Sequence, residues 1–165
     1  MAHKPKCNCF ACENGMEDFA CENGMEELKK ILKKIEADCI KKFGWYAHLV
    51  QNDDKCPSGV NGHTHNVKEA YGHKDLQICL PIQPEILNGF FTTVVDEIKK
   101  GKKFESGVEY DNIFSGGFKA KFLDAFECGR PVLRLLIPDK NGKYEGKYAE
   151  QLTKLNNEEF NPLNN

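Results

Sequence analysis

The chain has 165 residues, of which 40% are hydrophobic and eleven are phenylalanine, enough apolar material for one domain with a single core. A formal net charge of −2 removes the electrostatic case for nucleic acid as a partner. The sequence shows no run of about 18 apolar residues that could span a bilayer and no apolar signal-peptide core, so we expect a cytoplasmic protein with reduced cysteines and no membrane partner.

Near the N-terminus a nine-residue unit is written twice, FACENGMED at residues 10–18 and FACENGMEE at residues 19–27. With the preceding CNC triplet, the repeat gathers half of the eight cysteines: Cys7, Cys9, Cys12 and Cys21. A continuous helix would hold Cys12 and Cys21 about 13.5 Å apart, too far for one zinc ion. The Asn-Gly pairs favour turns, and a looped segment brings the thiolates within reach of one metal.

Three interpretations of this cysteine segment stay open. The simplest is a duplication in an arm on which little packs. The second is a structural zinc site, and the third is redox or copper chemistry.

The first regular element follows the repeat. Apolar residues recur at helical spacing and predict an amphipathic helix that ends before Gly44: Leu28, Ile31, Leu32, Ile35, Cys39 and Phe43. Residues 45–50 then alternate in the manner of a strand, and residues 75–82 form a more apolar strand that ends at a proline.

A second helix is predicted over residues 84–99. Pro84 suits the first helical position, and Gly101 follows the end of the pattern. Its apolar stripe requires a sheet to cover it: Ile86, Leu87, Phe90, Phe91, Val94, Val95 and Ile98.

The last third reads as strands and turns. Residues 118–126 and 132–137 predict two strands joined as an antiparallel hairpin. We therefore predict an α+β fold, with a mainly antiparallel sheet and two amphipathic helices packed on one face. The expected organisation is a cysteine-rich arm at 1–27, a single α+β domain at 28–149 and a frayed tail at 150–165.

The segment GVNGHTHNVKEAYGH, residues 59–73, is the second candidate site. His63 and His65 are two residues apart, so on a strand both face one side, and Glu69 and His73 follow closely. Imidazole and carboxylate groups suit zinc and other first-row metals, and three such ligands with an open position can activate water. The alternative is a polar loop whose histidines form local hydrogen bonds or line a small pocket.

The order of these features resembles the domain of unknown function 4262 family of small bacterial proteins. The likeness covers most of residues 7–148, and the doubled arm departs from the family pattern. It rests on C-x-x-C at Cys9 and Cys12, Gly44-Trp45, HTHNV at 63–67, GHKDLQICLPI at 72–82, a helix beginning PE, and the stretches GKKFESGVEY and RLLIPDKNGKY. The resemblance implies one compact α+β domain and directs attention to His65, His73 and the N-terminal cysteines.

Our leading functional prediction is a small binding or interaction module for a protein or small-molecule partner rather than an enzyme. In this interpretation zinc, bound by Cys7, Cys9, Cys12 and Cys21, pins the N-terminal arm to the body. One alternative is a metal-dependent enzyme that uses His63, His65, Glu69 and His73. The other is a thiol-redox sensor built on the N-terminal cysteines.

Overall fold

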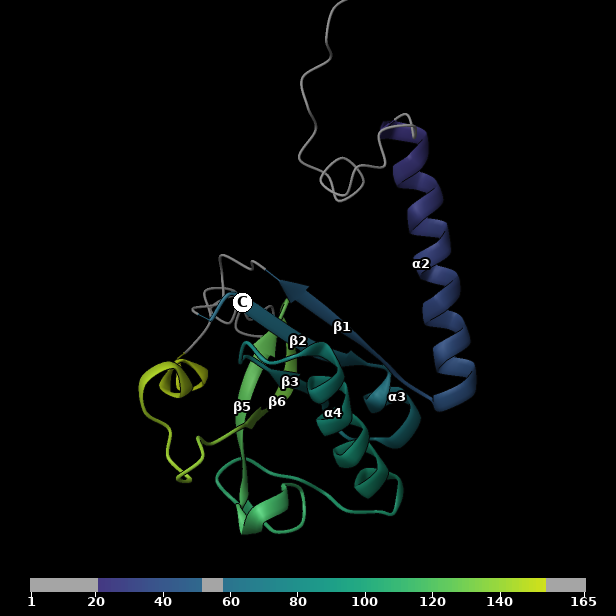
Figure 1. Cartoon of the computed structure of the whole chain (residues 1–165). Helices are drawn as coiled ribbons and strands as arrows, with labels where there is room; N and C mark the ends of the chain where they lie inside the picture. The colour runs from purple at the N-terminus through teal and green to yellow at the C-terminus, as the bar shows by residue number, and fades with distance from the viewer. Residues whose placement is uncertain (1–20, 52–57, 154–165) are drawn as a thin grey trace, which may run out of the picture. The chain divides into compact units, whose positions relative to one another are not determined.

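The computed structural model describes residues 21–51 and 58–153 and divides the chain into two units, Met1–Phe43 and Gly44–Asn165. The described part of the first unit is one helix, α2 (Cys21–Phe43), and the second unit is built on a six-stranded sheet (Figure 1). The fold is α+β, as predicted. The boundaries predicted at 27 and 149 stay predictions.

Helix α2 is longer than predicted, because it begins at Cys21 and includes the Asn23-Gly24 pair. One glycine inside a helix costs about 1 kcal/mol, which the good helix formers that follow it offset. The helix ends before Gly44, whose φ of 83° favours glycine. Its apolar side chains Ile31, Leu32 and Ile35 are about half exposed, and the packing of α2 on the sheet stays a prediction.

The sheet has the strand order β1-β2-β3-β6-β5-β4. Its strands are β1 (Tyr46–Gln51), β2 (Val60–His65), β3 (Asp75–Ile78), β4 (Glu109–Tyr110), β5 (Ala120–Glu127) and β6 (Arg130–Leu136). All neighbours pair antiparallel except β3 and β6, which are parallel. The sheet is therefore mixed, because the chain leaves β3, builds α4, β4 and β5, and returns beside β3 in the same direction.

The predicted hairpin is β5 and β6. Its turn is Cys128-Gly129, where both residues have positive φ, 48° and 78°. This is the backbone of a two-residue type I′ turn, whose twist matches that of the strands. The strands therefore extend closer to the turn than the sequence predicted, with Glu127 opposite Arg130.

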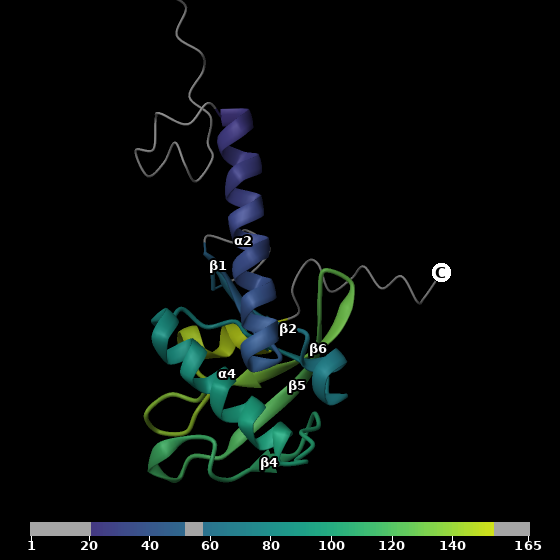
Figure 2. The same ribbon diagram turned by 90° about the vertical axis from the view of Figure 1, so that its right-hand side faces the viewer.

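Helix α4 (Pro84–Lys99) covers one face of the sheet (Figure 2). It buries five side chains of the predicted stripe: Leu87, Phe91, Val94, Val95 and Ile98. They pack with Leu76, Ile78, Phe122, Leu133 and Leu135 of the strands. Ile86 of the same stripe is half exposed. Among the described residues, no helix has the length and apolar character needed to cross a membrane.

The opposite face of the sheet has a region of buried polar side chains, which we call the polar face. The strand register aligns His63 with Gln77 and Gln77 with Arg134, and all three are less than 5% exposed. The 3-10 helix η2 (Gly146–Leu152) contributes the fully buried Gln151, which bonds through its side chain to both the N–H and the carbonyl of Ile137. These two bonds tie η2 to Ile137, the residue that follows β6.

The close approach of α4 to β2 gives a stability prediction. A side chain at Gly62 would meet Leu87 Cδ1 at 2.6 Å, whereas one at Gly89 in α4 would meet open space. Gly62→Ala should lower the free energy of unfolding by about 1–3 kcal/mol through overpacking. Gly89→Ala should raise it by about 0.5–1 kcal/mol through helix propensity. Urea unfolding of the wild type and both variants measures these changes in the free energy of unfolding. Changes of equal size and the same sign would contradict this packing.

Candidate metal centre

The pairing of β1 with β2 brings three histidines together. His48 lies opposite His63 and Tyr46 lies opposite His65, so all four rings are on the same side of the sheet. His48, His63 and His65 each offer a nitrogen atom, and these atoms lie within 4.8 Å of one another. Their ring centroids are 4.7 to 5.6 Å apart, and the ring planes are inclined by 66° to 82°. We call these three residues the histidine cluster.

The cluster fits a tetrahedral metal after a small contraction. Zn–N bonds of about 2.0–2.1 Å at tetrahedral angles place ligand nitrogens about 3.3 Å apart. The nitrogens must therefore approach one another by up to about 1.5 Å. His48 lies on β1, the edge strand of the sheet, and is only partly buried, so it has room to make this movement.

His65 shows the clearest need for a ligand. Its Nε2 is buried and has no hydrogen-bond partner among the described residues. Such an atom costs free energy unless a ligand or water satisfies it. The ring is held in place by Tyr46, which stacks on it at 4.9 Å with the planes inclined by only 13°.

The electrostatics keep two of these rings neutral. Burial lowers the pKa of His63 to about 4, against the opposing effect of the Glu127 carboxylate and with support from Arg130. Burial also lowers the pKa of His65 to about 4, with smaller contributions from Arg130 and the other two histidines. Both rings are thus neutral at pH 7, and a neutral imidazole binds a metal without first losing a proton.

A carboxylate lies beside the cluster. Glu127 Oε1 is 3.7 Å from His63 Nε2. Burial opposes the charge of Glu127, but hydrogen bonds from Cys128 and Arg130 and the nearby His63 outweigh it and lower the pKa of this carboxyl. The site therefore places a carboxylate next to neutral nitrogen donors, a combination of groups that suits first-row metals.

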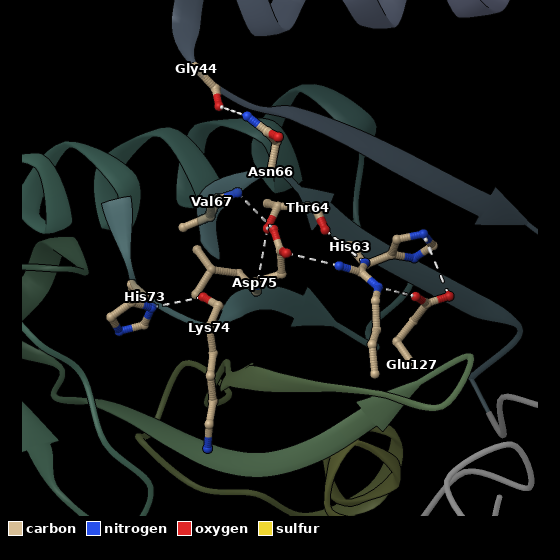
Figure 3. Close-up of polar contacts among 11 residues, drawn as sticks. Gly44, His63, Thr64, Asn66, Val67, His73, Lys74, Asp75 and Glu127 are labelled. Carbon is tan, nitrogen blue, oxygen red and sulfur yellow. Dashed lines mark hydrogen bonds and ion pairs between the residues drawn. The ribbon is translucent and has the colours of Figure 1, made fainter. Parts of the chain in front are cut away.

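Arg130 fixes this carboxylate. Its Nε donates to Glu127 Oε2 at 2.8 Å, and its other nitrogens donate to Asp75 Oδ2 at 2.9 Å and to the Thr64 carbonyl at 2.8 Å. Asp75 also accepts from the Thr64 hydroxyl and the Val67 N–H (Figure 3). Burial raises the pKa of Asp75 despite these bonds. The network ties β2, β3 and the β5–β6 hairpin together next to the cluster.

The structure does not bring His73 and Glu69 to the cluster. His73 Nδ1 donates to the Lys74 carbonyl at 2.8 Å (Figure 3). Its Nε2 accepts from the Phe104 N–H at 3.2 Å, so both nitrogens are used. His73 also lines a cavity of about 490 Å³. Glu69 is exposed on the short helix α3 (Val67–Tyr71). The left-handed φ of 71° at Asn66 ends the strand and starts this helix.

The N-terminal cysteine prediction falls outside what the structure describes. Cys7, Cys9 and Cys12 lie outside the described residues, and so does the side chain of Cys21, the first residue of α2. The cysteines whose side chains the structure describes, Cys39, Cys79 and Cys128, form no disulfide. A zinc ion bound by the N-terminal cysteines stays a prediction.

Sequence reasoning missed His48 and Glu127. His48 falls in the predicted strand at 45–50, but only the β1–β2 register shows that it faces His63. Glu127 is at the end of β5, 64 positions from His63, and no local sequence pattern connects the two.

Comparison of the chain with family models, with curated proteins and with solved structures gave no match. The resemblance to the domain of unknown function 4262 family therefore stays a prediction.

The lowered histidine pKa values give a pH prediction for the metal-free protein. Between about pH 6.5 and pH 4 the unfolded chain binds protons at His63 and His65 that the folded chain does not bind. The free energy of unfolding should therefore fall as the pH is lowered through this range. Urea unfolding in the presence of chelator, repeated at several pH values in this range, measures this free energy. In His63→Gln its slope against pH should be smaller by the equivalent of up to about one proton. Identical slopes for the two proteins would contradict the buried neutral ring.

Proposed function

We propose that the protein binds a divalent first-row transition metal, with zinc as the first choice, at His48, His63 and His65. The observation that carries the proposal is the convergence of three imidazole nitrogens within 4.8 Å from two paired strands. Imidazole is the commonest side-chain ligand for these metals, and three imidazoles match the protein ligands of one class of zinc site.

The surroundings support a metal over simple ring packing. His63 and His65 are neutral, and His65 Nε2 has no hydrogen-bond partner among the described residues. A carboxylate held by Arg130 adds negative charge next to the rings. A bound cation would satisfy the buried nitrogen, whereas apolar ring contacts would not.

Three protein ligands leave a fourth tetrahedral position for water or a small molecule. Zinc sites that bind substrates keep this position open, whereas structural sites fill it with a fourth side chain. We therefore propose that a small-molecule partner binds at the open position of the metal. Metal-dependent catalysis on that bound molecule is the activity that such a site would support. Three further proposals rest on the sequence alone: a cysteine-bound zinc, a thiol sensor and a cytoplasmic location.

Elemental analysis of protein purified without chelator tests the proposal. Wild-type protein should carry about one zinc ion per chain. The ion should persist when Cys9, Cys12 and Cys21 are replaced together by serine. It should be lost in His48→Ala and in His65→Ala, since each removes one of three ligands. Glu69→Gln, which changes an exposed carboxylate on α3, is the control and should keep the metal.

The reverse pattern would contradict the proposal. Zinc that survives His65→Ala and disappears with the cysteine changes would favour the structural zinc of the N-terminal arm. Circular dichroism of each variant separates loss of a ligand from loss of the fold.

A further inference from the structure

We propose that Arg134, Gln77 and Asn61 are positioning residues that hold the proton of His63 on Nδ1 and so keep the lone pair of Nε2 available for the metal. This inference rests on the proposed function, because it explains how one ligand of that site is prepared. We call the three residues the amide relay.

The relay runs across the strands of the polar face. Arg134 Nε donates to Gln77 Oε1 at 2.8 Å, and Gln77 Nε2 donates to Asn61 Oδ1 at 3.1 Å. Asn61 Oδ1 lies 3.4 Å from His63 Nδ1. The strand register produces this arrangement, since His63 pairs with Gln77 on β3 and Gln77 pairs with Arg134 on β6. Asn61 precedes His63 by two positions on β2 and therefore faces the same side.

The donor-only chemistry of Arg134 decides the direction of every bond. A guanidinium has no acceptor, so the Gln77 atom that faces Arg134 must be its oxygen. The amide nitrogen of Gln77 then faces Asn61, so the Asn61 atom that receives it must also be an oxygen. That oxygen can only accept from His63, which requires a proton on Nδ1. Amide orientations that are ambiguous in isolation become fixed by this chain.

Burial makes the relay stable. Arg134 and Gln77 are fully buried, Asn61 is 2% exposed and His63 is 4% exposed. Water therefore does not compete for these groups, and reversing one bond would leave two donors or two acceptors facing each other. Arg134 is anchored at its far side by the carbonyls of Gln151 and Thr153, both at 3.0 Å.

Glu127 competes with the relay at the other nitrogen of His63. A proton on Nε2 would face Glu127 Oε1, but the 3.7 Å separation is too long for a hydrogen bond. The other oxygen of Glu127 already accepts from Arg130 at 2.8 Å. The relay therefore favours the tautomer with the proton on Nδ1, which leaves the lone pair of Nε2 on the side of Glu127.

The variant Gln77→Glu reverses the polarity of the relay with almost no change in shape. The new carboxylate still accepts from Arg134 but has no proton to donate to Asn61. The Asn61 amide must then turn its nitrogen toward the carboxylate and toward His63 Nδ1, which becomes an acceptor. The proton of His63 moves to Nε2, and the metal loses a ready ligand.

Long-range proton–nitrogen NMR of the zinc-free protein at pH 7.5 reads the tautomer directly. His63, assigned with His63→Gln, should carry its proton on Nδ1 in the wild type and on Nε2 in Gln77→Glu. Zinc affinity of Gln77→Glu should fall roughly 10–100-fold, the usual effect of changing a group that orients a metal ligand. Asn61→Asp is the matched control, because it also adds one negative charge. Its carboxylate still offers an acceptor to His63, so the proton should stay on Nδ1. His73, which donates from Nδ1 to Lys74, is an internal reference for an intact fold.

The results separate this inference from the proposed function. A wild-type His63 with its proton on Nε2, or a tautomer that does not respond to Gln77→Glu, overturns the relay even if zinc binds. A tautomer that switches as expected supports the relay even if the wild type binds no zinc, and in that case the metal proposal alone fails.

Discussion

The pairing of β1 with β2 in one register is the constraint on which the site depends. It places His48 opposite His63 and leaves His65 beside them on the same face. A slip of one residue would turn His48 to the other face of the sheet and dissolve the cluster. The register is held from the core side, where Gly62 lies under Leu87 and the Thr64 hydroxyl accepts from the Leu76 N–H. The chemistry on one face thus depends on packing at the other.

Strand β2 has two different faces. Toward α4 it presents Gly62, which lets Leu87 of the helix approach closely. Toward the opposite side it presents Asn61 and His63, buried polar groups that need complete hydrogen bonding. Gln77 and Arg134 supply this bonding from the next two strands. The mixed sheet matters here, since the parallel pairing of β3 with β6 brings Arg134 beside Gln77.

The sequence predicted those helices and strands whose formation depends on local residue patterns. The apolar stripe of residues 84–99 and the hairpin of residues 118–137 gave α4 and β5–β6, because their periodicity and turn residues act locally. The two-residue spacing of His63 and His65 placed both rings on one side. Strand β2 as a whole was not evident, since VNGHTH lacks the apolar alternation of an ordinary strand. His48, Glu127 and the amide relay come from pairings between distant segments, which no local pattern encodes.

X-ray absorption spectroscopy at the zinc edge of the zinc-loaded wild-type protein would identify the atoms bound to the metal. We expect three imidazole ligands with Zn–N distances of about 2.0–2.1 Å and one further light atom in the open position. A shell of sulfur at about 2.3 Å would instead place the metal on cysteine thiolates and contradict the histidine cluster as its site.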